Sequence, residues 1–511
     1  MKKYILGYQF NMNSVIKVLT SSFLIIATSA VLAQSPYALI GTDIQGSGPV
    51  GWVQGADLGK RMQYIMEAWA MGDEFMGSVL IAENGDVVYK GAFGMASESY
   101  DVVNTSETRY LISYMSFHFT QFAIAQFVEK DELHLDEPVS NYLPDLQSQH
   151  FDEITIRHLL NFESGLNESL EGFINTREAH DLNYLLKLID DQPLIAPPGN
   201  NYAFGWASPI LLAKVIENLS QKSYSNFIKE DIVDKLNLSN TGFYRESPIT
   251  KNLSTPYSRI FNELVPYDQG NIHHLGPQGA MFSTITDLYD FYNYVSDWLG
   301  KATERGKEAM GIVTYGVSDG LLVRDIEKHP SEVTFDLLDT NGWFNGSTGL
   351  LTCLTDQKSM IIVLSNKFRA SEIYDIRRRF MRSIYDLPVG MPLPKTRMSI
   401  WQKLKNEGYL AAAKYYEKLV SQGIGSVPLR DEFMHLSREL RNKGEYTQAL
   451  ELSRMFVEMD DQWVAHRELG EVYRLMGETE LAKESFKKSL QRKPSNPNWK
   501  KEMEKFLKNE P

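Results

Sequence analysis

Residues 109–130, RYLISYMSFHFTQFAIAQFVEK, place hydroxyl groups and an imidazole at the start of an apolar run with helical spacing. The side chains from which a nucleophile and a base for acyl transfer could be built are Ser113, Tyr114, Ser116 and His118. A serine nucleophile needs a basic group beside it, and on a helix that neighbour stands three or four residues away. Ser113 is followed at that distance by Ser116, and Ser116 by Phe119. No lysine occurs until Lys130, so the basic partner is missing.

Other reactive patterns in the chain are weaker. Literal Ser-x-x-Lys spacings occur at Ser14/Lys17 and Ser485/Lys488, in an export-like segment and in a helical repeat region, and we take both as chance. His273 and His274 are candidates for metal binding, but adjacent side chains point apart on most backbones and do not favour one shared ion. The sequence therefore predicts no metal site and no cofactor.

Residues 57–385, which surround these candidates, alternate between strand and helix patterns. Residues 74–96 contain two alternating apolar runs around Asn84-Gly85-Asp86, which predicts a β-hairpin. Residues 349–368 predict a second hairpin that turns at 356–358. Helical spacing occupies 118–130, 279–295 and two stretches within 197–243. The middle of the chain is thus expected to be an α+β domain.

Three phrases in this region carry a family resemblance: LDEPVSNYLP, ITIRHLL…SGL and PG…Y…ILLAKVIE. In this order they resemble the serine β-lactamase and penicillin-binding protein superfamily. The nearest branch is that of class C β-lactamases, D-alanyl-D-alanine carboxypeptidases and related esterases. The resemblance covers about residues 60–385. It implies a β-lactamase/transpeptidase-like fold, in which an antiparallel sheet is packed by helices and the active cleft lies beside a helical subdomain.

Enzymes of that superfamily begin their catalytic helix with Ser-x-x-Lys, in which the amine helps take the proton of the serine hydroxyl. The segment HFTQFAIA sets the register of this helix here. It places Tyr114 at the nucleophile and Phe117 at the lysine. Both reactive groups of the first motif are therefore replaced by aromatic side chains.

The other two motifs are degenerate as well. Tyr-x-Asn, which supplies a base and an amide, falls on Phe204, Gly205 and Trp206. A literal Tyr224-Ser225-Asn226 lies where the superfamily opens a later helix. The third motif, a cation followed by Thr or Ser and Gly, falls on Thr340, Asn341 and Gly342. There the cation is lost and the glycine remains.

Loss at three motifs of one cleft favours a pseudoenzyme, an exported domain that binds a ligand or partner without serine acyl-enzyme hydrolysis. The aromatic residues at Tyr114, Phe117, Phe204 and Trp206 indicate either a filled cleft or a pocket for an apolar ligand. Backbone N–H donors of the superfamily's oxyanion hole do not depend on these side chains. The expected ligand is therefore a small apolar molecule with a carbonyl or carboxylate group.

Two alternatives stay open. One is a hydrolase of the β-lactamase, esterase or carboxypeptidase class with replaced residues: Tyr114, Ser113 or Ser116 as nucleophile and His118 as a weak replacement base. Tyr114 suits this role poorly, because a phenol with a pKa of about 10 is neutral at pH 7 without an adjacent cation. The other is a scaffold that contacts a protein partner through its C-terminal repeats.

The composition and the N-terminal segment limit the class of partner and the location of the protein. The chain has 511 residues, of which 43% are hydrophobic, and a net charge of −13, which argues against a nucleic-acid partner. Residues 1–33 have the pattern of a signal peptide, with lysines before an apolar run that ends in small residues. Met12 is an alternative start to Met1. We expect cleavage before Gln34, no membrane span afterwards, and a periplasmic or secreted location.

The rest of the chain divides into linkers and repeats. Residues 34–56 and the proline-rich stretch 386–399 are predicted linkers, and 400–511 are helical in pattern. Within the last part, Gly444 and Ala449 recur as Gly477 and Ala482 at an offset of 33 residues, with a fainter copy at Gly408. This period is typical of tetratricopeptide repeats, whose small residues let paired helices approach closely.

Overall fold

The computed structural model describes residues 57–71, 75–168, 182–200, 202–244, 250–260, 263–267, 280–311, 313–316, 334–344, 346–368, 370 and 372–385, and in the C-terminal part 402–404, 406–421, 434, 436–438, 440–441, 443–459, 461–494 and 497–508. The predicted signal peptide, both predicted linkers, His273 and His274 lie outside these ranges. Within the ranges, none of the helices has the length and hydropathy that a membrane span requires.

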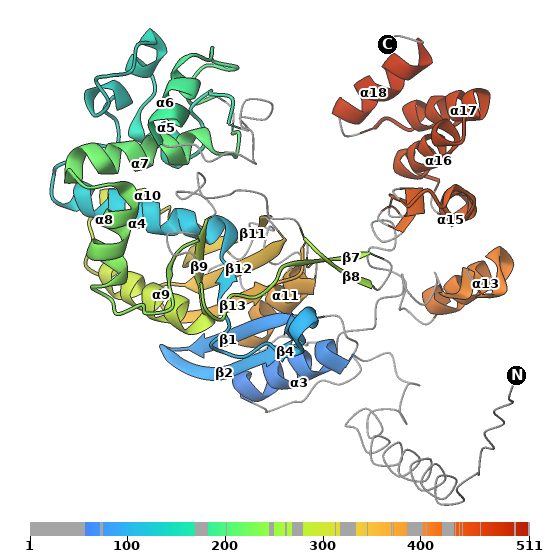
Figure 1. Cartoon of the computed structure of the whole chain (residues 1–511), viewed down its shortest axis with the longest axis horizontal. Helices are drawn as coiled ribbons and strands as arrows, with labels where there is room; N and C mark the ends of the chain where they lie inside the picture. The colour runs from blue at the N-terminus through green and yellow to red at the C-terminus, as the bar shows by residue number, and fades with distance from the viewer. Residues whose placement is uncertain are drawn as a thin grey trace, which may run out of the picture.

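A six-stranded antiparallel sheet forms the centre of the described part of residues 57–385 (Figure 1). Its strand order is β10 (Val313–Gly316), β11 (Thr334–Phe344), β12 (Ser347–Leu354), β13 (Ser359–Ser365), β1 (Gly77–Glu83) and β2 (Asp86–Phe93). Both predicted hairpins are present, as β1–β2 and β12–β13. Asn84 and Gly85 connect the first pair with positive φ angles of 54° and 85°, as the two-residue turn requires.

Both faces of the sheet are buried, because its central strands carry apolar side chains at successive positions. Val79 and Ile81 face α3 (Leu58–Met71) and α11 (Glu372–Ile384). Leu80 and Ala82 point the other way, into the core that contains α4 (Ser116–Glu129) and α9 (Ile285–Leu299). Successive residues of a strand alternate between faces, so one strand contributes to two cores. The expected α+β architecture is confirmed.

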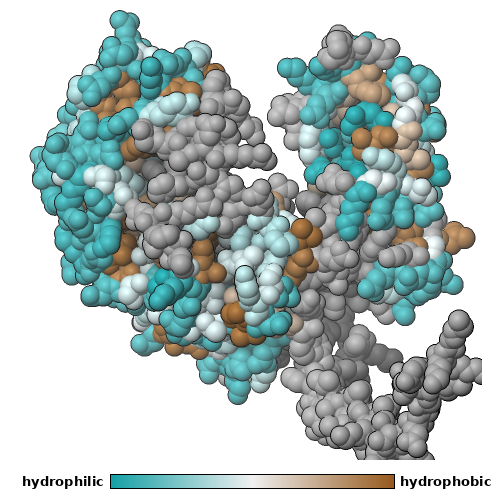
Figure 2. All heavy atoms as spheres, in the orientation of Figure 1, coloured by the Kyte–Doolittle hydropathy of each residue, from teal (hydrophilic) through white to brown (hydrophobic). Residues whose placement is uncertain are grey.

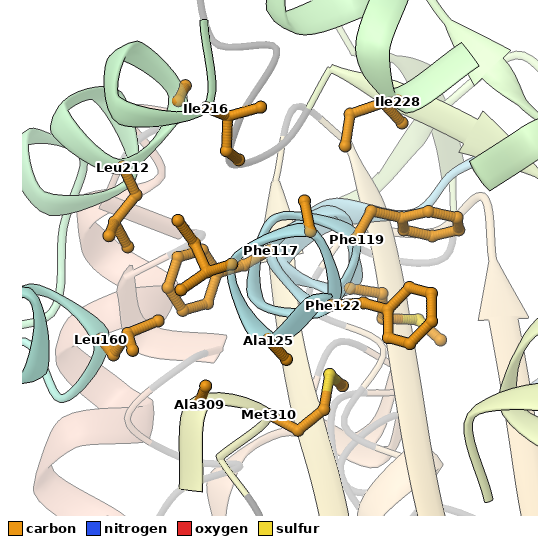
Figure 3. Packing of buried hydrophobic residues seen from close by; sticks show 14 of the residues in the cluster. Phe117, Phe119, Phe122, Ala125, Leu160, Leu212, Ile216, Ile228, Ala309 and Met310 are labelled. Carbon is orange, nitrogen blue, oxygen red and sulfur yellow. The ribbon is translucent and has the colours of Figure 1, made fainter. Parts of the chain in front are cut away.

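A group of helices lies on the far side of α4 from the sheet (Figure 1). It contains α5 (Ile156–Leu160), α6 (Leu182–Asp190), α7 (Ala207–Ser220), α8 (Tyr224–Ile228) and the π-helical turn η5 (Lys229–Val233). Helix α10 (Glu304–Ala309) packs on another side of α4, where Figure 3 shows Ala309 opposite Ile216. Tyr224 starts α8, and its buried hydroxyl lies 2.7 Å from Thr120 Oγ1 of α4. The literal Tyr-Ser-Asn sequence is therefore part of the core.

Short elements complete this domain. They are β3 (Met95–Ser97), β4 (Val102–Val103), β5 (Tyr110–Leu111), β6 (Gly242–Phe243), β7 (Tyr257–Ile260), β8 (Glu263–Pro266), β9 (Met281–Ser283), η1 (Glu98–Tyr100), η2 (Ser113–Met115), η3 (Val139–Asn141) and η4 (Gln149–Asp152). Strands β5, β9 and β6 form a small sheet, and its first strand leads directly into η2.

The described C-terminal part is helical, as expected. It contains α13 (Tyr409–Ser421), α15 (Tyr446–Met459), α16 (Trp463–Leu475), α17 (Thr479–Gln491) and α18 (Pro497–Leu507). Gly408, Gly444 and Gly477, aligned by the repeat, share positive φ angles of 82°, 77° and 80°. A Cβ at Gly470 would lie 2.5 Å from the Phe486 ring, so the glycine lets α16 and α17 approach closely. Polar side chains cover much of the visible face of these helices (Figure 2).

Candidate ligand-binding site

Helix α4 and the turn before it position the first motif. Most of α4 is buried, which is typical of a helix that is apolar all round. Phe119 stacks on Phe291 with ring centroids 4.1 Å apart. Figure 3 shows Phe117, Phe119 and Phe122 projecting from α4 in different directions, with Leu160 on the side of Phe117. Burial on all sides fixes the rotation of α4, and with it the directions of the side chains at its N-terminus.

A cavity of about 600 Å³ opens between η2, α4, the loop before α7, strand β11 and α11. Its lining includes the following residues that the sequence analysis predicted as motif positions or replacement candidates: Tyr114, Phe117, His118, Phe204, Thr340, Asn341 and Gly342. The tertiary structure thus brings together parts of all three degenerate motifs. Trp206 and Ser116 are not in the lining. Trp206 packs instead against Leu111 and Ala280, beside the cavity.

Four of the lining residues form a continuous aromatic cluster with Phe162. The ring centroid of Tyr114 lies 4.6 Å from that of Phe204 in an edge-to-face arrangement. Phe162 continues the cluster, 4.6 Å from Phe204, 5.0 Å from Phe117 and 6.3 Å from Tyr202. Phe204 and Tyr202 remain 40% and 64% exposed, so the cluster presents an apolar face toward solvent. These rings make the cavity apolar at the position of the missing reactive groups.

The ring of Tyr114 lies directly against strand β11. A Cβ built on Gly342 would be 2.2 Å from Tyr114 Cδ2 and 2.6 Å from its Cε2, far inside van der Waals contact. Only glycine at this position leaves room for the ring. Gly342, predicted at the third motif, therefore accommodates the ring of Tyr114, which was predicted at the nucleophile position of the first motif.

Burial shifts the pKa values of two titratable groups at the cavity. Burial lowers the pKa of His118 to about 3, and its Nδ1 lies 3.0 Å from the Tyr292 hydroxyl. Burial raises the pKa of the Tyr114 phenol above its usual value. Ser116 is fully buried, and its Oγ has no hydrogen-bond partner among the described residues. The side chain of Ser113 lies outside the described set.

Asp339, which the sequence analysis did not single out, is the carboxylate in the described lining. It accepts hydrogen bonds from Thr352 Oγ1 at 2.5 Å and Arg377 Nη1 at 3.0 Å. Burial raises its pKa, against the opposing effect of Arg377. The described lining contains neither lysine nor arginine. Asp339 precedes Thr340 in the third motif, and this adjacency is the signal that could have identified it.

A second overlooked residue, Glu168, holds the loop that carries Phe204. Its buried carboxylate accepts hydrogen bonds from the Ser208 backbone N–H at 2.9 Å, from Ser164 Oγ at 2.9 Å and from Ser208 Oγ. Its backbone carbonyl accepts the Trp206 N–H at 2.7 Å. A carboxylate at this place caps the N-terminus of α7 and offsets its dipole. Burial nevertheless raises the pKa of Glu168.

Phe162, at the centre of the aromatic cluster, has a φ of 56°. A bulky residue in the left-handed region is strained, by about 1–3 kcal/mol, and persists only where its surroundings enforce it. The Ala203 N–H donates to the Phe162 carbonyl at 2.8 Å, which joins this strained residue to the loop of Tyr202 and Phe204. Such strain is concentrated at binding and catalytic sites in proteins.

Comparison with known proteins places this cleft in a family context. A family model described as Beta-lactamase matches residues 64–385. Penicillin-binding protein 4* of Bacillus subtilis is 24% identical over 332 residues, which cover 61% of this chain and 73% of the relative. Teichoic acid D-alanine hydrolase of Staphylococcus aureus is 28% identical over 222 residues, 42% of this chain and 52% of the relative. The chain thus spans only about half the length of the second protein.

Solved structures show the same fold. FmtA from Staphylococcus aureus matches with a TM-score of 0.51 and 20% identity over 65% of this chain and 89% of that one. A class C β-lactamase matches with a TM-score of 0.53 and 16% identity over 64% of this chain and 96% of its own.

Proposed function

The chain belongs to the β-lactamase family, and from this premise we propose that it is a pseudoenzyme that binds a small apolar ligand non-covalently in the cleft between η2 and β11. The observation that carries the proposal is the contact of the Tyr114 ring with Gly342. The ring of Phe204 packs against Tyr114 in an edge-to-face arrangement. Tyr114 and Phe204 are assigned from the sequence to the positions of the superfamily's nucleophile and base, and both rings line a cavity of about 600 Å³.

The chemical character of the described lining residues supports this function over hydrolysis. Covalent catalysis requires a nucleophile and a base within hydrogen-bond reach. The phenol of Tyr114 has a raised pKa, and the described lining offers no lysine or arginine to stabilise a phenolate. Ser116 is sealed in the core. A hydrolase of the β-lactamase, esterase or carboxypeptidase class with replaced residues is the alternative, and its nucleophile would have to be Tyr114, Ser113 or Ser116.

The cleft favours a ligand with an apolar body and an uncharged polar group. The exposed rings of Phe204 and Tyr202 suit the apolar body. Strand β10 pairs only with residues 334–337 of β11, so the adjoining edge beyond Leu337 has no partner among the described strands. Backbone groups on that edge suit a carbonyl. A carboxylate, the other expected group, would lack a cationic partner in the described lining.

Covalent labelling and ligand binding test the proposal together. The purified protein is incubated with a penicillin and with a fluorophosphonate, and intact-mass analysis should show no stoichiometric adduct. A thermal-shift screen should then yield a ligand whose affinity, measured by calorimetry, falls by about 1–3 kcal/mol in Phe204→Ala. Tyr100→Ala is the control, because Tyr100 is 81% exposed and outside the cavity lining. A stable adduct on Ser113 or Ser116, or an unchanged affinity in Phe204→Ala, would contradict the proposal.

A second candidate function, contact with a protein partner, concerns the C-terminal helices. Their two apolar clusters contain residues of this part alone, and Leu410 and Leu481 remain 80% and 42% exposed. We place both functions outside the cytoplasm, since the B. subtilis relative is named a penicillin-binding protein and the S. aureus relative acts on teichoic acid. N-terminal sequencing of the native protein should start near Gln34. Recovery of residues 13–30 in a membrane fraction would contradict export.

A further inference from the structure

Two polar side chains of α4 belong to the wall of the cavity that the aromatic rings border. His118 and Gln121 both line it, although they are only 5% and 7% exposed. They stand three residues apart, about one turn of the helix, and so share the face that also carries Phe117. This face of α4 therefore brings an imidazole and an amide to the cavity beside an aromatic ring.

The side-chain amide of Gln121 forms no hydrogen bond with the residues that the structure describes. The neighbouring Thr120, by contrast, lies in the core with its Oγ1 2.7 Å from the Tyr224 hydroxyl. A Cβ built on Gly311, another lining residue, would lie 2.7 Å from Gln121 Nε2, so the amide packs against the cavity wall. An amide has one acceptor oxygen and two N–H donors, and burial without partners costs stability. Such a group at a cavity wall is available to a ligand.

Hydrogen bonding fixes which nitrogen of His118 carries the proton. Its Nδ1 lies 3.0 Å from the hydroxyl of Tyr292, which is fully buried and lies outside the cavity lining. That hydroxyl has no other hydrogen-bond partner among the described residues, so we assign its proton to the bond with Nδ1. Burial keeps the imidazole neutral by lowering its pKa to about 3. The ring proton is then on Nε2, on the other side of the ring, where it is a donor for the cavity.

We propose that His118 and Gln121 bind the carboxamide group of a ligand whose apolar body lies on the aromatic cluster. This inference rests on the non-covalent binding function proposed above and names the polar group that the cleft selects. The carboxamide carbonyl accepts the His118 Nε2–H, and the carboxamide N–H donates to Gln121 Oε1. An ester offers the carbonyl without the N–H. A carboxylate brings a charge that neither neutral side chain balances, so both groups match the pair less well.

Calorimetry with three probes of one shape tests the proposal: naphthalene carboxamide, the methyl ester and the carboxylate. The purified protein should bind the carboxamide about tenfold more tightly than either analogue. Gln121→Leu, which removes the amide at similar volume, should weaken carboxamide binding by about the same factor and leave ester binding unchanged. Gln126→Leu is the matched control, because Gln126 is on the same helix but outside the described cavity lining. Equal affinity for carboxamide and ester, or an equal effect of the two variants, would overturn the proposal.

Thermal stability separates ligand binding from a merely structural role of Gln121. Without ligand, Gln121→Leu should raise the melting temperature, because it removes a buried amide that has no partner, whereas loss of a structural amide would lower it. His118→Phe should weaken the carboxamide and the ester alike, since both have the carbonyl that the Nε2–H binds. Circular dichroism verifies that each variant is folded, and if Gln121→Leu is not, Gln121→Met takes its place.

Failure of this inference differs from failure of the proposed binding function. If Phe204→Ala weakens the carboxamide and the ester while Gln121→Leu alters neither, the carboxamide assignment is wrong and the apolar cleft stands. If none of the three probes binds, the carboxamide assignment is overturned, and the thermal-shift screen alone decides the binding function.

Discussion

The aromatic cleft is adjacent to a second site, the Glu168 junction, where the buried carboxylate of Glu168 accepts hydrogen bonds at the start of α7. The two sites differ in their polar groups: the cleft is lined by aromatic rings, whereas the junction has a buried acid. In the cleft, aromatic side chains line the cavity at Tyr114, Phe117 and Phe204, the positions that the sequence analysis predicted for a nucleophile and two basic groups. At the junction, Glu168 remains a buried acid with hydrogen bonds from Ser164 and Ser208. The two sites are connected, since the backbone of Glu168 also accepts the N–H of Trp206, two residues after Phe204.

The difference shows which polar groups the fold requires. Glu168 satisfies donors at the start of α7 that would otherwise be buried without a partner, so its loss would cost stability. Reactive groups in a cleft contribute to chemistry and often carry strain, and their replacement by aromatic side chains adds buried apolar contact. The fold of this family is therefore compatible with aromatic side chains at Tyr114, Phe117 and Phe204.

The largest expected effect concerns the catalytic rate: a variant with one restored motif should still hydrolyse far more slowly than an active relative. Tyr114→Ser with Phe117→Lys recreates Ser-x-x-Lys, but the predicted positions of the base, the amide and the cation are still Phe204, Trp206 and Thr340. Catalytic groups act as a unit, so we expect hydrolysis to remain roughly 10³-fold or more below that of an active relative. Turnover of nitrocefin and of a p-nitrophenyl ester measures this, with Phe117→Lys alone as the control. Efficient hydrolysis by the double variant would show that the other two motifs still function.

Removal of the Glu168 carboxylate should give the largest loss of stability. Glu168→Ala leaves the Ser208 N–H and two serine hydroxyls without their acceptor, and we expect the free energy of unfolding to fall by about 4 kcal/mol. Glu168→Gln should cost about half as much. Urea unfolding measures both, and Glu163→Ala, in the same loop, should stay within about 0.5 kcal/mol of the parent. An unchanged free energy of unfolding in Glu168→Ala would contradict the structural role given to this carboxylate.

His118 makes the cleft sensitive to acid. Its pKa is about 3 in the folded protein and near 6.5 when unfolded, so between these values the unfolded chain binds more protons. The free energy of unfolding should therefore fall as the pH falls below 6.5, by about 1.4 kcal/mol per pH unit from this group. His118→Gln should remove that part of the pH dependence, and His134→Gln, at an exposed histidine, should not. Parallel curves for parent and His118→Gln would contradict a neutral, buried imidazole.

The Tyr114–Gly342 contact is tested by a double-mutant cycle. Gly342→Ala forces a Cβ into the Tyr114 ring and should destabilise the protein by about 2 kcal/mol. In a Tyr114→Ser background the same change should cost much less, because the ring is absent. Gly300→Ala is the control, since the nearest atom to its Cβ would be 3.6 Å away. Additive effects would place the ring away from β11.

Local patterns allowed much of this architecture to be predicted. The β1–β2 turn, the β12–β13 hairpin and the aligned glycines of the C-terminal helices each depend on residues close in sequence. Tyr114, Phe204 and residues 340–342, which the sequence analysis assigned to three separate motifs, lie at one cavity. Trp206 was expected at this cavity too, but it stands at the N-cap position of α7 and its side chain packs against Leu111.

The sequence by itself determined the family frame, and it predicted aromatic side chains at the motif positions, because both depend on residue type and order. Only the tertiary structure decided that Tyr114 packs on Gly342 and that the ring of Phe162 lies between those of Phe117 and Phe204. It also decided that the Glu168 carboxylate caps the N-terminus of α7. These contacts join residues tens to hundreds of positions apart. Their geometry depends on how α4, β11 and the loop before α7 pack together, and no local pattern encodes that packing.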